Sequence, residues 1–153
     1  MIQRLFFLLP ALLLLACGGE NAATTEAESG PTPAEVQEEA AYESMIAAHD
    51  RVMPRMGEIS RAQIGLRDLM QQEGISEETM SAAKVPFDRL EAIHDGMMDW
   101  MREAMQPLDS VRAQLGSHEE VMAFYRAQED AMLGMEEKLD PTFEEVNALL
   151  NNE

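Results

Sequence analysis

The spacing of apolar positions along the chain predicts three long helices. From about residue 33 to residue 72, apolar side chains or His and Met recur every three or four residues, as on one face of an α-helix. This first stripe consists of Val36, Ala40, Ile46, His49, Met53, Met56, Ile59, Leu66 and Met70. Gly74 follows the stripe and is a typical residue beyond a helix end. The sequence therefore predicts one long helix that ends near residue 72.

Two further stripes follow. The second starts after Ser76, a typical N-cap residue, and ends before Pro107. It consists of Met80, Phe87, Leu90, His94, Met98, Met101 and Met105. The third stripe continues to the end of the chain and consists of Val121, Phe124, Gln128, Met132, Met135, Leu139, Phe143, Val146 and Leu150. Between them, residues 107–116 form a connection with one predicted turn of helix around Leu108 to Leu115.

Local signals support these boundaries. Thr32 and Glu35 have the spacing of a capping box, with Pro33 at the first helical position, and Ser117 and Glu120 have the same spacing.

The internal prolines interrupt the stripes to different degrees. The periodicity continues through Pro54 and Pro86, which predicts kinks rather than breaks. Asp140 and Pro141 mark a place where the third helix could divide.

These features together predict the fold class. Few β-branched residues and no alternating runs argue against a sheet. Aromatic residues make up 5% of the chain and Met occurs 13 times, so the core must consist of Leu, Ala, Ile and Met. Short connections predict that residues 32–153 form an all-α, up-down-up antiparallel three-helix bundle with long, proline-kinked helices and an optional short fourth helix.

The first 31 residues have a different composition. Met1 to Ala16 has one basic residue, Arg4, and an apolar run too short to span a bilayer, which is typical of a signal peptide. The run ends in Leu-Leu-Ala-Cys at residues 14–17, which resembles the lipobox of bacterial lipoproteins. The resemblance implies cleavage before Cys17, lipid on its sulfur and amino group, and export. Residues 17–31, small and acidic, then form a flexible tether.

The cysteine content and the net charge limit the kinds of site and partner that the sequence predicts. Cys17 is the only Cys, so the sequence predicts no disulfide, thiolate metal site or thiol nucleophile. The next residue is Gly18 rather than Asp, which resembles lipoproteins sent to the outer membrane, where the body would face the periplasm. The formal charge is -18, which disfavours nucleic acid as a partner because the phosphate backbone would be repelled.

A repeated His and Met pattern is the main candidate for chemistry. Each His is followed four residues later by Met, and two of them again after seven, which places the side chains on one helix face. The candidate ligands are His49, Met53, Met56, His94, Met98, Met101, His118 and Met122, and Asp50 and Asp95 are candidates to hydrogen-bond and orient the ligands. Imidazole and thioether donors without thiolates or converging carboxylates favour Cu(I). The alternative is that Met simply fills the core.

Whether these groups meet depends on how the helices align. A hairpin turn near residue 74 places His49 level with about residue 100. A second connection centred near residue 111 places Met122 near Met101 and His118 near Met105. All three copies would then lie in one slab of the bundle.

Other chemistry finds less support. His118-Glu-Glu-Val-Met122 begins like a zinc-protease motif, but Met122 stands where the second His is required. Glu91 and His94 form one Glu-x-x-His motif, whereas a di-iron bundle needs a second copy. There is no glycine-rich phosphate loop and no Ser-His-Asp spacing, so the sequence does not predict an enzyme.

Three segments, 49–59, 97–102 and 118–125, look like those of small bacterial envelope lipoproteins often labelled "viral A-type inclusion protein". The resemblance covers about residues 40–135 and implies a helical fold and an envelope location, but no reaction or ligand. The first functional hypothesis is therefore a non-catalytic, lipid-anchored interaction module that binds an envelope protein. The alternative is a Cu(I) buffer or chaperone.

Overall fold

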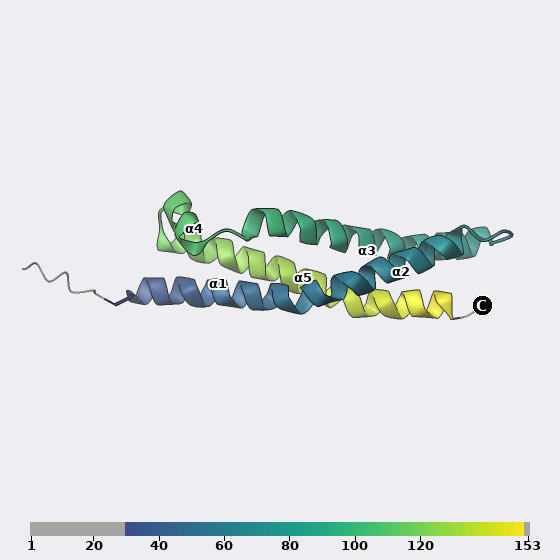
Figure 1. Cartoon of the computed structure of the whole chain (residues 1–153), viewed down its shortest axis with the longest axis horizontal. Helices are drawn as coiled ribbons and strands as arrows, with labels where there is room; N and C mark the ends of the chain where they lie inside the picture. The colour runs from purple at the N-terminus through teal and green to yellow at the C-terminus, as the bar shows by residue number, and fades with distance from the viewer. Residues whose placement is uncertain (1–29, 152–153) are drawn as a thin grey trace, which may run out of the picture. The chain divides into compact units, whose positions relative to one another are not determined.

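The computed structural model describes residues 30–151, and within this range every regular element is a helix. The elements are α1 (Pro33–Val52), the 3₁₀ turn η1 (Met53–Arg55), α2 (Met56–Met70), α3 (Glu77–Ala104), α4 (Leu108–Leu115) and α5 (His118–Leu150) (Figure 1). The prediction of an all-α bundle is confirmed. The compact helical unit begins at Pro31. The predicted signal peptide, Cys17 and most of the tether lie outside the described residues.

Side-chain caps start three of the helices. At α1, the Thr32 hydroxyl accepts from the N–H of Glu35 at 3.3 Å, and the Glu35 carboxylate accepts from the Thr32 N–H at 2.6 Å, which completes the predicted capping box. Ser76 accepts from the N–H three residues on and caps α3. Ser117 caps α5 in the same way, but its hydroxyl also donates to the Glu120 carboxylate at 2.6 Å. The predicted helix starts are therefore confirmed.

The internal prolines affect the helices differently. Pro54 lies in η1, so α1 passes into α2 through a single tighter turn. Pro86 and Pro141 stay inside α3 and α5, and α5 is not divided at Pro141 as the sequence had suggested it could be. Two glycines with positive φ, Gly74 (+82°) and Gly116 (+79°), follow α2 and α4, where residues with side chains would be strained.

Helices α1 and α5 lie side by side and point the same way. Three pairs of contacting side chains, all separated by 85 residues, fix this arrangement: Ser44 with Glu129, Arg51 with Glu136, and Arg55 with Asp140. Helix α3 runs in the opposite direction, because Trp100 contacts Gln128 whereas the earlier residue Arg89 contacts the later residue Glu145. Helix α2 packs on α3, and α4 crosses the end of the bundle against α1 and α5 (Figure 1).

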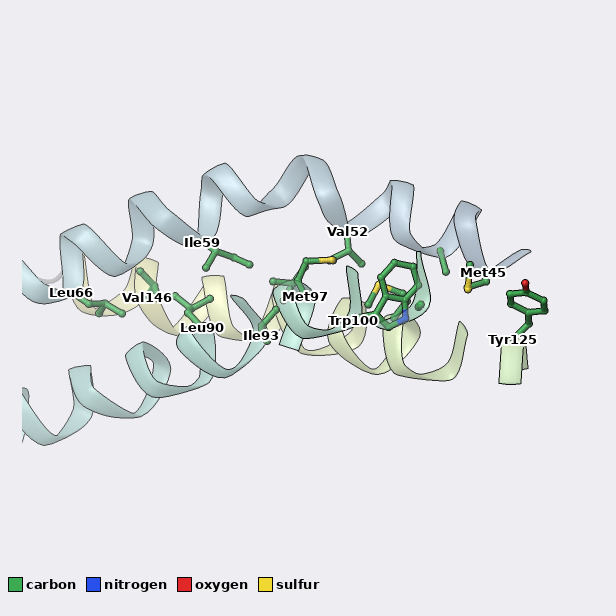
Figure 2. Close-up of a cluster of buried hydrophobic side chains, with 14 of the residues drawn as sticks. Met45, Val52, Ile59, Leu66, Leu90, Ile93, Met97, Trp100, Tyr125 and Val146 are labelled. Atoms are coloured by element: carbon green, nitrogen blue, oxygen red, sulfur yellow. The ribbon is translucent and has the colours of Figure 1, made fainter. Parts of the chain in front are cut away.

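The core is a continuous row of side chains from α1, α2, α3 and α5 (Figure 2). In α3 the buried residues are Ala83, Pro86, Leu90, Ile93, Met97, Trp100 and Ala104. The predicted stripe on this helix was wrong in phase by about one residue, since Met98 and Met101 are only half-buried and Met105 is exposed. Met97 and Met98 are neighbours, so a Met-rich sequence fits two adjacent faces of a helix equally well.

The other two stripes contain smaller corrections. In the first stripe, Val36 of α1 and Met53 of η1 are exposed, and the buried positions of α1 are Glu38, Met45, Ala48, His49 and Val52. In α5, the predicted Val121, Met132, Leu139 and Val146 are buried, together with Tyr125 and Thr142, which the sequence analysis had not selected. Within residues 30–151 no helix is both long and apolar enough to cross a membrane.

Candidate functional site

Two imidazoles contact the aspartate that follows them in sequence. Nδ1 of His49 lies 3.0 Å from Oδ1 of Asp50, and Nδ1 of His94 lies 3.2 Å from Oδ1 of Asp95. A carboxylate is only an acceptor, so in a neutral imidazole each contact favours the tautomer with the proton on Nδ1. The role of the two aspartates beside a metal ligand stays a prediction, but their position next to the imidazoles suits it.

His49 lies in the core between α1 and α3. Its residue is 8% exposed, and its ring stacks on Trp100 with 5.2 Å between centroids and 13° between planes. The predicted alignment of His49 with residue 100 is therefore confirmed. Trp100 in turn donates from Nε1 to the Gln128 carbonyl of α5 at 3.0 Å, which fixes the indole across the bundle. Nε2 of His49 is buried and has no hydrogen-bond partner in the described chain.

His118 lies at a different level. Its Nδ1 is 2.8 Å from Oε1 of Glu38. Because Glu38 precedes His49 by three turns of α1, the two imidazoles are separated by about 16 Å along the helix axis at 1.5 Å per residue. The predicted single slab is therefore wrong for His118.

The predicted position of Met122, in the third copy of the pattern, is wrong for the same reason. Trp100 faces Gln128, so Met122 does not lie opposite Met101 as predicted. The start of α5 instead lies against α1 and α4, since His118 contacts Glu38 and shares a small pocket with Arg112. The predicted alignment of α3 with α5 assumed a connection centred near residue 111, whereas α4 lies across the end of the bundle.

The candidate metal ligands consequently do not converge into one centre. Met56, Met98, Met101 and Met122 are half-buried, and Met53 is exposed. The side chain of His94 is 39% exposed. Among residues 30–151 no group of three or more His, Cys, Asp or Glu side chains could hold a metal ion. Because His118 and Met122 lie at a different level of the bundle from His49, the eight candidate residues do not form one shared site.

A buried charge cluster, not foreseen from the sequence, joins α1, α4 and α5. Glu38 is 5% exposed, and its two carboxylate oxygens accept from Nε of Arg112 at 2.5 Å and from Nδ1 of His118. The Arg112 guanidinium holds the pKa of Glu38 below its usual value, with help from His118 and against the effect of burial. A sequence signal existed, because Glu38 is in phase with the buried residues Met45 and Val52.

Tyr125 lies near this cluster and is fully buried. Its ring packs edge-on against Tyr42 and Phe124, with centroid distances of 5.6 and 5.2 Å. Its hydroxyl has no hydrogen-bond partner in the described chain. Burial raises the pKa of Tyr125 to about 12, because the phenolate would lose its hydration.

A groove of about 430 Å³ follows the N-terminal half of α1. We call it the α1 groove, and its lining consists of Pro31, Glu35, Val36, Glu39, Ala40, Glu43 and Arg112. Val36 is 53% exposed in it. Arg112 is already engaged by Glu38, and neither Glu39 nor Glu43 has an ion-pair partner among residues 30–151. The α1 groove thus combines an exposed apolar strip with negative charge that is not neutralised.

Two other grooves differ in charge. One, of about 530 Å³ between α3 and α5, has Arg89 and Lys138 as well as Asp130 at its rim. Another, of about 480 Å³ between α2 and α5, contains Arg55 and Arg61 beside Glu58. Each of these grooves has two basic residues and one acidic residue in its lining, so neither has the excess of negative charge that the α1 groove has. No protein-family model, curated protein or solved structure matches the chain.

Proposed function

We propose that the chain is a non-catalytic, lipid-anchored protein of the bacterial cell envelope whose helical body binds a partner protein. The sequence of residues 14–17 supports lipid attachment at Cys17, and the small, acidic segment after it suits a tether. The proposed location is the periplasmic face of the outer membrane. The role of the helical body rests on the α1 groove.

The partner that fits this groove is a basic amphipathic helix. Glu39 and Glu43 are spaced by one turn of α1, so their carboxylates follow one edge of the strip that contains Val36 and Ala40. A helix with Leu or Ile on one face would cover the strip, and Lys or Arg beside that face would meet the carboxylates. The chain's formal charge of -18 would also accelerate the approach of a cationic partner.

The test uses two synthetic helical peptides with the same Leu positions. One carries Lys and the other Glu on the flanking positions, and each has a fluorophore for anisotropy measurements with the full chain in detergent. We expect the Lys peptide to bind with a Kd on the order of 1–10 μM, weakening as salt is added, and the Glu peptide not to bind.

Matched variants distinguish binding at the α1 groove from attraction to the net negative charge of the whole chain. Val36→Ser should weaken the Lys peptide several-fold, and Glu39→Gln with Glu43→Gln should weaken it and reduce its salt dependence. Val85→Ser is the control, because Val85 is equally exposed at 55% but lies on α3. Equal binding of the two peptides, or equal effects of Val36→Ser and Val85→Ser, would contradict the proposal.

A further inference from the structure

The solvent-facing side of α5 carries charges of opposite sign that the chain itself leaves unpaired. Asp130 and Lys138 are exposed, and neither has an ion-pair partner among residues 30–151. Gly134 lies midway between them, one turn of α5 from each, so the three residues form a row along one face of the helix. Along this row the charge changes from negative to positive. A second row of the same kind, running in the opposite direction, would match it charge for charge.

The row borders the groove of about 530 Å³ between α3 and α5, which we call the α3–α5 groove. Besides the charged residues, four apolar residues line this groove: Ala92, Ile93, Ala131 and Met135. Leu133 lies on the other side of the row and is 40% exposed. An added Cβ at Gly134 would meet open space, so another backbone is able to approach α5 closely at this point. The face of α5 around Gly134 therefore offers apolar surface on both sides of the charged row.

We propose that this face of α5 binds a second copy of the chain, antiparallel to the first, about a two-fold axis that passes near Gly134. In a two-fold contact, a residue of one copy meets a given residue of the other, and the reverse contact occurs as well. Asp130 of each copy then meets Lys138 of the other, and Leu133 meets its own counterpart. A parallel pair would place Asp130 opposite Asp130 and Lys138 opposite Lys138, so the charges favour the antiparallel arrangement.

A second set of charges fits the same arrangement. Arg126 is exposed and has no ion-pair partner among residues 30–151; it lies eight residues before Gly134, and Glu144 lies ten residues after it. Arg126 of one copy therefore comes near Glu137 and Glu144 of the other. These pairs oppose the repulsion between two chains of formal charge -18, which salt also screens. The contact includes no residue that lines the α1 groove, so it does not depend on the proposed helix binding.

Analytical ultracentrifugation of the full chain in density-matched detergent measures this contact. Cys17→Ala is present throughout, because it removes the only thiol. We expect a monomer–dimer equilibrium with a Kd on the order of 10 μM. Lys138→Glu should weaken the dimer about 10-fold or more, because each ion pair becomes two carboxylates. Lys84→Glu is the matched control, because it makes the same charge change at an exposed lysine of α3 outside the α3–α5 groove, and it should leave the Kd unchanged.

Asp130→Lys distinguishes the proposed pairs from overall repulsion between acidic chains. It reduces the net negative charge and would strengthen association if only overall repulsion mattered, whereas we expect it to weaken the dimer about as much as Lys138→Glu. In a mixed pair of one Asp130→Lys chain and one Lys138→Glu chain, both contacts between positions 130 and 138 again join opposite charges. An equimolar mixture should therefore dimerise about as strongly as wild type, although each variant alone does not.

Disulfide cross-linking locates the axis. Gly134→Cys should form a linked dimer on mild oxidation, because the two residues at position 134 lie beside the axis. Val85→Cys is the control, because Val85 is 55% exposed on α3 but does not line the α3–α5 groove, and it should stay unlinked. Circular dichroism shows whether the charge variants fold, and the cross-link decides if they do not. A monomer up to about 100 μM, stronger association of Asp130→Lys, no recovery on mixing, or equal cross-linking at positions 85 and 134 would overturn the proposal.

Discussion

Glu38→Ala should destabilise the helical body substantially, although the neighbouring Glu39 is dispensable. The wild-type carboxylate is nearly inaccessible and accepts charged hydrogen bonds from Arg112 and His118. Hydrogen bonds to charged groups contribute about 1.5–3 kcal/mol each. The full sum should not be lost, because the Arg112 side chain is 27% exposed and still donates to Asp109 and to the backbone oxygen of Glu35. We therefore expect a loss of about 3 kcal/mol.

Urea unfolding followed by circular dichroism at 222 nm measures this loss. Glu39→Ala is the control, because Glu39 is exposed and has no ion-pair partner among residues 30–151; it should change the free energy of unfolding by less than about 0.5 kcal/mol. A double-mutant cycle with Arg112→Ala should give a coupling energy of about 2 kcal/mol. Equal effects of Glu38→Ala and Glu39→Ala, or a coupling energy near zero, would refute the reasoning.

The same cluster predicts a pH dependence. The pKa of Glu38 is lower in the folded protein than its usual value of 4.5, mainly because Arg112 donates to it. Its contribution to stability is therefore present above that value and is lost as the pH falls through the folded-state pKa. The difference in stability between wild type and Glu38→Gln should be largest near neutral pH and should shrink as the pH falls below 4.5 through the folded-state pKa.

Two further predictions concern single groups. Tyr125→Phe should stabilise the protein by about 1 kcal/mol at pH 7, because the buried hydroxyl has no hydrogen-bond partner among the described residues. Wild type should also lose stability between pH 10 and about 12, because in this range the tyrosine ionises only in the unfolded state, and Tyr125→Phe should remove this loss. Urea unfolding at both pH values measures it, and lower stability of Tyr125→Phe at pH 7 would contradict it. Gly74→Ala should destabilise the protein by about 1 kcal/mol, because the φ of Gly74 is +82°. Gly134→Ala should stabilise it by about 0.5–1 kcal/mol, because Gly134 lies inside α5 and an added Cβ would meet open space. Thermal unfolding of both variants in parallel tests this, and shifts of the same sign would contradict it.

Local signals in the sequence were sufficient to predict the helices and the residues at which they begin and end. The Thr32 capping box, the Ser76 cap, Gly74 and the Leu108–Leu115 helix each depend on residues within one or two turns. Interactions of this range are decided by the chain itself and leave a direct pattern of residue types.

The candidate site was harder to predict because it depends on distant alignment. Glu38 meets Arg112 and His118 across 74 and 80 residues, and no local pattern encodes those pairs. A repeated His and Met spacing shows which face of each helix the residues share, but not the level at which two helices meet. The phase error in α3 arose because Met97 and Met98 are alike in hydrophobicity, whereas packing distinguishes them.

The three contacts between α1 and α5 limit how these two helices can slide. Shifted by one heptad in one direction, Arg51 would regain a carboxylate at Glu129, but Arg55 would face Leu133. Shifted the other way, Arg51 would face Phe143 and Arg55 would face Asn147. Two parallel apolar surfaces alone tolerate such slippage. The polar pairs therefore select one register of α1 against α5.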